Sequence, residues 1–406
     1  AAGCGFDKGA GSGGGGGIDD GGIADGGTAD GATASDASSD AGPNCDELLP
    51  FEPSNFAACD LDYVPQDLVL DEFGGYLLDT DTRVLTHPGG SRQTLKGVTI
   101  GQTDAPTIFV IFYRSFNLSA GSALTIRGAR AFALVTRDDL VVNGSMGVPA
   151  SWVVSGAGGD NNAACVPGGR GHPGVLQSSG ALSGGSGGGG GGFGAGGGRG
   201  AVVDGASGAV RTRAGLANGD VTLVPLRGGC RGGFGGDPAS NGGPAGGAGG
   251  ALQLVAGGTL QVVGYVTARG GGGQGVVGPS GGGGGGGSGG GLLLEATDLT
   301  IDGQLTANGG GGGEGGRAAG DSDFGSNGHD WDGAQASGGS LGSFGGDGGA
   351  GGALAGVDGE DGLVGTSDAS DLAGGGGGGG SVGRIHLRAI GTLTIGDAAL
   401  ISPAAQ

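Results

Sequence analysis

Five oxygen-bearing side chains lie close together in one glycine-rich stretch of this chain. They are Asp321, Asp323, Asn327, Asp330 and Asp332. Carboxylate and amide oxygens are the hard ligands that Ca²⁺ prefers. Because the stretch lacks the glycine and the distal glutamate of an EF-hand loop, the sequence allows either a solvated loop tip or a Ca²⁺ site of another kind. We predict no other cofactor.

Cysteines are the second group of residues that could do chemistry. They are Cys4, Cys45, Cys59, Cys165 and Cys230. None forms a Cys-x-x-Cys pair and no histidine accompanies them at zinc-site spacing, so the pattern disfavours a metal framework. We predict two disulfides among the last four, with their connectivity open, and therefore an oxidising compartment. Cys4 is left for lipidation or for a disulfide to another chain.

The four histidines are scattered along the chain. His87 and His172 each precede a proline in a glycine-rich turn, and His386 is expected on the solvent side of a strand. A catalytic histidine needs a nucleophile or an orienting carboxylate within reach. The sequence indicates neither, so we predict no catalytic residue and no enzymatic activity.

Glycine dominates the composition, with 116 of 406 residues. Collagen is excluded, because there is no sustained Gly-X-Y period and only 14 prolines are present. Hydrophobic residues make up 36% of the chain. They cluster in alternating apolar and polar runs, which are typical of half-buried strands. The composition therefore favours thin β layers combined with ordered glycine segments.

The charge balance excludes one class of partner. Eighteen Lys and Arg residues against 39 Asp and Glu residues give a formal net charge of −21, which repels nucleic acid and anionic membrane surfaces. One stretch, 231–236, has the residues of an RNA-binding RGG segment, but the basic footprint of such proteins is missing. We expect no nucleic-acid partner.

Three regions follow one another along the chain. Residues 1–44 form a Gly/Asp-rich tether or assembly arm with almost no bulky apolar side chains. Residues 45–120 form a small β region, in which 108–113 is the most strand-like run. Residues 121–406 form a Gly-rich β-repeat domain.

The repeat domain alternates strand-like units with glycine tracts. Units begin at Leu252, Leu292 and Ile385, with a divergent copy near Val135. Period-2 alternation places Leu252 and Leu254 on one face, and the equivalent residues of the other units likewise. One unit cannot bury that face alone, whereas stacked units can. We therefore predict an all-β fold of stacked strand repeats, either β-solenoid or sandwich-like, with no obvious cap after the strand-like residues 399–401.

The glycine tracts between the units allow two interpretations. They are 187–192, 281–287, 309–313 and 374–380. One interpretation is flexible linkers. The other is a bundle of polyglycine II helices, which have three residues per turn and no internal hydrogen bonds. We favour the bundle, because excursions such as 270–291 carry tracts on both arms of a turn.

These motifs resemble known families. The runs 122–126 and 139–144, followed by glycine-rich inserts and repeated L-x-[LI]-x-A units, resemble glycine-rich surface proteins of Gram-negative bacteria. The tracts are similar to those of polyglycine-II bundle proteins, such as glycine-rich antifreeze proteins and phage adhesin tips. Residues 1–4, Ala-Ala-Gly-Cys, resemble a bacterial lipobox, although Ala1 stands at the usual leucine position. Because residues 1–3 are retained, a Cys4 disulfide is favoured over lipidation.

Together these observations predict a structural subunit of an extracellular fibre or surface layer. It would self-assemble through its N-terminal arm and its exposed β edges, since unprotected edges template association. Its partner would be a second copy of the chain, and a membrane would be involved only if Cys4 is lipidated. The alternative is a lipid-anchored, monomeric surface adhesin or binding protein.

Overall fold

A computed structural model describes most of the chain after residue 47. The described residues are 48–406 except 162, 174–183, 203–209, 237–241, 277–279, 317–321, 342–344 and 367–372. The chain divides into two units, 1–42 and 43–406, and only the second contains described residues. The predicted tether or arm, 1–44, therefore lies outside the described residues.

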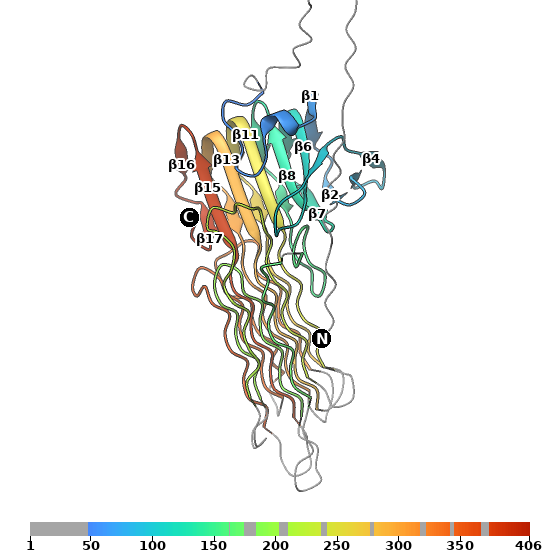
Figure 1. The fold of residues 1–406 in the computed structure, drawn as a ribbon, viewed down its shortest axis with the longest axis vertical. Helices are drawn as coiled ribbons and strands as arrows, with labels where there is room; N and C mark the ends of the chain where they lie inside the picture. The colour runs from blue at the N-terminus through green and yellow to red at the C-terminus, as the bar shows by residue number, and fades with distance from the viewer. Residues whose placement is uncertain are drawn as a thin grey trace, which may run out of the picture. The chain divides into compact units, whose positions relative to one another are not determined.

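The strand-forming runs of the second unit build two sheets, as the all-β prediction requires (Figure 1). The nine-stranded sheet contains β1 (Tyr63–Leu70), β5 (Val98–Ile100), β6 (Ile108–Leu118), β8 (Ala131–Thr136), β9 (Leu140–Val142), β11 (Ala251–Val262), β13 (Gly291–Ile301), β15 (Arg384–Ala389) and β16 (Leu393–Ile395). The eight-stranded sheet contains β2 (Gly74–Asp79), β3 (Val84–Thr86), β4 (Arg92–Thr94), β7 (Ser122–Arg127), β10 (Ser145–Gly147), β12 (Tyr265–Thr267), β14 (Gln304–Thr306) and β17 (Leu400–Ser402). The only helix among the described residues is a 3-10 turn, η2 (Ala58–Asp60).

The two sheets stack their strands in the same chain order. The first sheet runs β1-β6-β8-β11-β13-β15, and the second runs β2-β7-β10-β12-β14-β17, with the antiparallel strands β3 and β4 added beyond β2. Neighbours along both of these paths are parallel. Each strand of the first path is thus followed in the chain, directly or after one short strand of the same sheet, by a strand of the second path. We call each such pair a rung.

The predicted apolar face forms the core between the sheets. Leu252 pairs in register with Leu292, and Leu292 pairs with Ile385. All three side chains are buried in one cluster with the equivalent leucines two residues further on. The alternation argument is therefore confirmed at these positions. The unit that begins at Leu252 lies in one long strand, Ala251–Val262, whose pairing with β13 is irregular between Ala256 and Thr259.

The strand-like run 108–113 lies within β6 and is buried on both faces. Its outer face packs against residues that precede the sheets, including Leu49 and Phe56. Strands of the predicted small β region pair directly with strands of the repeat domain, as β6 does with β8 and β2 with β7. Residues on both sides of position 120 thus share the same two sheets.

The glycine-rich excursions occupy one equivalent connection in the stack. They run from β10 to β11, from β12 to β13 and from β14 to β15, each time from the second sheet back to the first. The connection from β7 to β8 has the same role and takes only residues 128–130. The predicted insertion of variable segments between strand repeats is therefore confirmed. Figure 1 shows the excursions leaving the sheets on one side and running next to one another.

The expectation of an uncapped C-terminal strand edge is partly wrong. The backbone of Gln406 returns to β15, where its N–H donates to Ile385 O at 2.9 Å and its C=O accepts from Leu387 N at 3.4 Å. Ala405 packs against the core at the same place. This short return satisfies part of the β15 edge, which is what a strand cap does.

Candidate functional site

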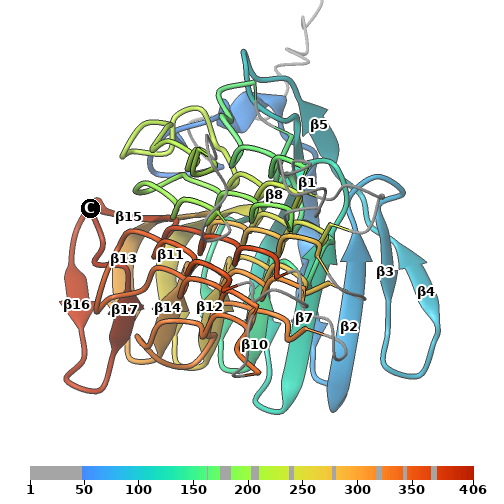
Figure 2. The same ribbon diagram turned by 90° about the horizontal axis from the view of Figure 1, so that it is seen from below.

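The segment 281–290 lies at the centre of the glycine-rich excursions. Its backbone amides donate in turn to three neighbouring segments, 230–236, 375–381 and 268–274. Each neighbour therefore accepts from every third amide of the central segment. The N···O distances lie between 2.6 and 3.1 Å. Its carbonyl groups accept, at the same interval of three residues, from the segments 185–191, 243–249 and 310–316. Six segments thus bond to the central one. Figure 2 shows the glycine-rich excursions from below.

Glycine is required in this array because the neighbouring segments leave no room for a Cβ atom. A Cβ atom added at any of the glycines 282–287 would lie between 1.9 and 2.1 Å from a carbonyl oxygen of a neighbouring segment. No Cβ can approach an oxygen so closely without displacing the backbone. None of these glycines has a left-handed φ, so conformational freedom is not the reason for their presence. Any side chain would disrupt the hydrogen-bonded packing.

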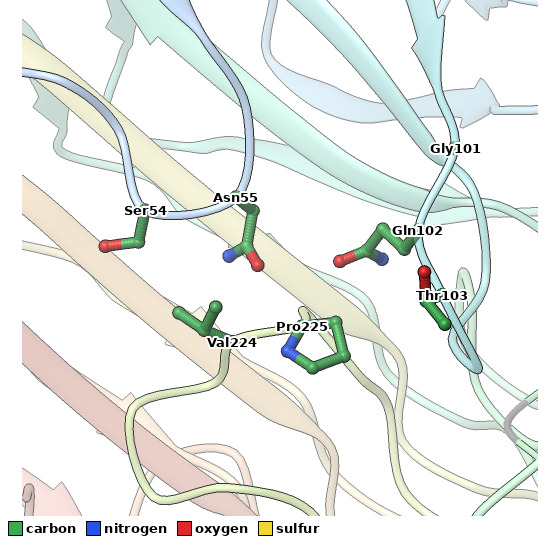
Figure 3. A pocket seen from close by; sticks show the side chains of 7 residues that line it. All are labelled: Ser54, Asn55, Gly101, Gln102, Thr103, Val224 and Pro225. Atoms are coloured by element: carbon green, nitrogen blue, oxygen red, sulfur yellow. The ribbon is translucent and has the colours of Figure 1, made fainter.

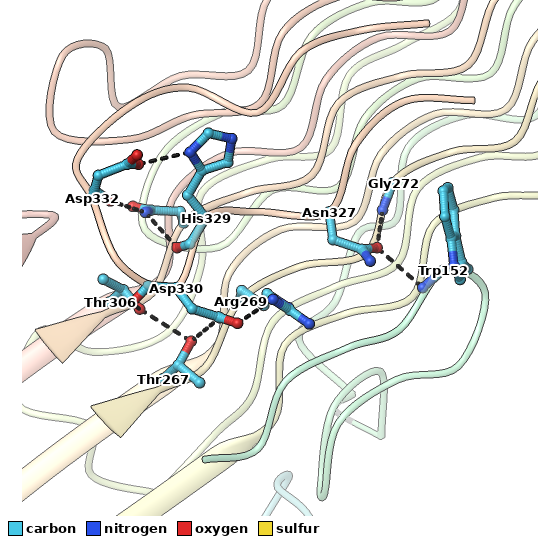
Figure 4. Close-up of polar contacts among 10 residues, drawn as sticks. Trp152, Thr267, Arg269, Gly272, Thr306, Asn327, His329, Asp330 and Asp332 are labelled. Carbon is cyan, nitrogen blue, oxygen red and sulfur yellow. Dashed lines mark hydrogen bonds and ion pairs between the residues drawn. The ribbon is translucent and has the colours of Figure 1, made fainter. Parts of the chain in front are cut away.

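The predicted calcium ligands that the structure describes accept hydrogen bonds from the protein itself, and Figure 4 shows three of them, Asn327, Asp330 and Asp332. Thr267 Oγ1 donates to Asp330 Oδ1 at 2.7 Å, and Arg269 forms an ion pair with the same carboxylate. Asp332 Oδ1 lies 2.7 Å from His329 Nδ1.

The remaining candidates bind backbone amides. Asn327 Oδ1 accepts from Trp152 N and Gly272 N, and Asp323 Oδ1 accepts from Phe324 N. Asp321 lies outside the described residues. Within the described part of the chain, no three His, Cys, Asp or Glu side chains are grouped so that they could hold a metal ion.

Asp330 is the most deeply placed carboxyl of this group. Burial raises its pKa above the ordinary value, while the Arg269 charge and the Thr267 hydrogen bond act in the opposite direction. Its backbone is held as well, since Thr306 Oγ1 donates to Asp330 O at 3.3 Å. Asn308 Nδ2 donates to the carbonyls of His329 and Asp332. Side chains at the ends of β12 and β14 therefore fix the loop 329–332.

A cleft of about 300 Å³ lies beside this fixed loop. Its lining is Ser145, Tyr265, Asp330 and Trp331. The Tyr265 side chain is 41% exposed and that of Trp331 is 59% exposed. The sequence analysis did not single out this cleft. One feature of the sequence could have indicated it: Trp331, one of only two tryptophans, lies inside a polar, glycine-rich stretch.

A second cleft, of about 220 Å³, lies over the outer face of the first sheet (Figure 3). Two of its polar side chains, Asn55 and Gln102, form hydrogen bonds to other parts of the protein. Asn55 Nδ2 donates to Leu223 O and to Gln253 Oε1. Gln102 accepts from Leu226 N and donates to Leu226 O. These contacts hold the segment 223–226 in place. The side-chain amides of Asn55 and Gln102 therefore have a structural role that needs no bound ligand.

Two of the cysteine candidates are joined. Cys165 and Cys230 form a disulfide with a Cα–Cα distance of 5.5 Å, and Cys230 is fully buried among the glycine segments. Cys59 is also disulfide-bonded. Cys4 and Cys45 lie outside the described residues. A disulfide of this kind is typical of proteins that fold in an oxidising environment.

Two histidines contact carboxylates that the sequence analysis did not anticipate. His87 Nδ1 lies 2.8 Å from Glu72 Oε1, and His329 contacts Asp332 as described above. The Glu72 side chain is half exposed. The Glu72 partner became visible only in the fold, because it is 15 residues from His87 in the chain, whereas Asp332 is three residues from His329.

The last rung leaves apolar side chains uncovered. Leu393 and Ile395 of β16 pair in register with Leu299 and Ile301, which are fully buried. They nevertheless remain 48% and 50% exposed, because β16 pairs with β13 alone among the described strands. At the other end of the second sheet, β3 continues beyond β2 and its Leu85 is buried. The β16 end of the stack therefore presents apolar side chains to solvent.

No family model, curated protein or solved structure matches this chain. Among its described residues, no helix is long and apolar enough to span a bilayer.

Proposed function

We propose that this chain is an extracellular structural subunit, in which a β-solenoid carries a bundle of polyglycine II helices and which self-associates through its open last rung. The solenoid interpretation is supported by the common chain order of the two parallel sheets. The extracellular location is supported by the buried Cys165–Cys230 disulfide.

The hydrogen-bond pattern supports polyglycine II for the tracts. A helix with three residues per turn turns successive peptide groups by 120°, so each third amide faces the same neighbour. The segment 374–383 repeats the pattern of the central one, donating in turn to 307–316, 185–191 and 357–363. Flexible linkers have no reason to keep such a period. A bundle of this kind is stiff, as a structural role requires.

Self-association rests on a single observation, the half-exposed Leu393 and Ile395. In the stack, an apolar residue at these register positions is buried when a following rung exists. A second copy that meets the open rung would bury both side chains, and apolar burial is the main driving force of association. A contact between two such rungs would be an isologous pair with two-fold symmetry. The predicted arm and Cys4 would add further contacts.

Sedimentation velocity over a range of protein concentrations tests this proposal. The wild-type chain is expected to associate, and Leu393→Arg is expected to remain monomeric because a charge would be buried in the contact. Leu216→Arg is the matched control, since Leu216 is 54% exposed and lies on an excursion, away from the last rung. A wild-type chain that stays monomeric at every concentration would contradict self-association.

A lipid-anchored, monomeric surface adhesin or binding protein is the second candidate. The exposed aromatic side chains of the Tyr265–Trp331 cleft favour it, because they offer a surface for a ligand. Mass spectrometry of the N-terminal peptide separates the two candidates. An acylated Cys4 supports the anchored form, whereas Cys4 in a disulfide between chains supports assembly.

A further inference from the structure

The loop that carries Trp331 is held rigidly at the junction of sheet and glycine segments. Four hydrogen bonds from Thr267, Thr306 and Asn308 hold residues 329–332, as Figure 4 shows in part. The preceding segment, 322–328, runs beside 270–276 through backbone hydrogen bonds at every third residue. The indole is thus presented on a fixed support.

This support exposes aromatic surface that the described fold does not bury. Trp331 stacks on His329 with ring centroids 5.7 Å apart, yet it stays 59% exposed and lines the cleft with Tyr265. Exposed apolar side chains that gather in one cleft are a common feature of ligand-binding sites. Only 4% of the residues in this chain are aromatic, so two exposed rings at one cleft are notable.

Polar groups in the same cleft complete a binding surface. A carboxylate has about four acceptor positions, and the Asp330 oxygens each accept from one protein donor, Thr267 or Arg269. Acceptor capacity therefore remains for a ligand hydroxyl. Ser145 and Tyr265 add hydroxyl groups that can both donate and accept. Aromatic faces with a few converging polar groups are the usual composition of a small-ligand site.

The chemistry of the cleft points to a neutral, polyhydroxylated ligand. An anion is disfavoured by the net charge of −21. A quaternary ammonium ion is best held by a cage of rings, whereas this cleft has two rings and a carboxylate already paired with Arg269. A pyranose has a face of C–H bonds that stacks on an indole and a rim of hydroxyl groups that matches Asp330 and Ser145.

The second tryptophan is held against the same segment. Trp152 contacts Phe324 edge-on at 5.4 Å, and both side chains are about 40% exposed. Asn327 ties the Trp152 backbone to the same segment, 322–332, that carries Trp331. We propose that this segment presents a binding site for an unbranched neutral oligosaccharide, with one pyranose stacked on Trp331 and the chain continuing toward Trp152.

Isothermal titration of the full chain with cellohexaose, maltohexaose and chitohexaose tests the proposal, with choline chloride as a fourth probe. At least one hexasaccharide is expected to bind, and Trp331→Ala is expected to weaken binding roughly tenfold or more, as loss of a buried aromatic anchor does. Trp152→Ala should weaken hexasaccharide binding less, and Trp331→Phe should retain part of it. Phe234→Ala is the control, because Phe234 is exposed but lies outside this segment.

Three results would overturn the proposal. They are the absence of binding to all three hexasaccharides, binding of choline in their place, and hexasaccharide binding that Trp331→Ala leaves unchanged. Thermal unfolding of each variant distinguishes a lost contact from a lost fold. Since these readouts are independent of sedimentation, the site can fail while self-association stands, and the reverse.

Discussion

At the scale of single residues, glycine acts in this protein through the absence of a side chain. In the central segment every added Cβ would meet a neighbouring carbonyl oxygen, whereas Gly89 has open space around it. The sequence could predict that glycine packs closely in the tracts. It could not predict which carbonyl each glycine faces, because those partners come from segments up to about two hundred residues away.

Gly283→Ala is expected to lower the free energy of unfolding by about 1–3 kcal/mol, since overpacking a tight interior costs that amount. The added Cβ would lie 2.0 Å from Gly313 O. Gly89→Ala is the matched control and should change it by less than about 1 kcal/mol. Urea unfolding measures both. Equal stability of the two variants would show that the tract is loosely packed.

Asp67 links stability to pH. Hydrogen bonds from Arg114 and Ser115 lower its pKa from 3.8 to about 2. A depressed folded-state pKa contributes stability above pH 3.8, and this contribution is lost as the pH falls towards 2. Asp67→Asn should therefore have a slightly lower Tm than wild type at pH 7, and the difference should shrink below pH 4. A difference that is constant between pH 7 and pH 2 would argue against this ion pair.

At the scale of elements, periodic patterns were the reliable guide. The alternation in the units that begin at Leu252, Leu292 and Ile385 predicted their shared face, because strand geometry is local. The return of Gln406 to β15 was not predictable, since one residue carries no periodicity. The aromatic cleft was missed for a related reason: Ser145, Tyr265 and Trp331 meet only through the stacking of distant rungs.

Two register partners test the stacking of rungs directly. Leu299→Ala should cost about 2–5 kcal/mol of unfolding free energy, because it leaves a cavity in the core. Leu393→Ala removes the same atoms one rung further on, where the side chain is half exposed, and should cost less than about 1 kcal/mol in the dilute monomer. Similar losses for both variants at low protein concentration would contradict the open last rung.

At the scale of the whole second unit, the chain combines β-sheets with hydrogen-bonded glycine segments. The two sheets bury apolar side chains between them, and the excursions that leave them satisfy their backbone groups by bonding to one another. Backbone groups away from water need such partners, which explains how long glycine tracts can be ordered without a side-chain core. The disulfide between Cys165 and Cys230 lies within this glycine array and restricts its longest excursion.

Amide hydrogen exchange across residues 281–290 tests this hydrogen-bonded order most directly. We predict slow exchange, similar to that of β11 and β13, because every amide of 282–290 donates to a neighbouring segment. The same peptide measured in urea-unfolded protein gives the unprotected reference. Exchange in the native protein at the rate of that reference would mean that the tracts are linkers, and it would contradict the glycine bundle.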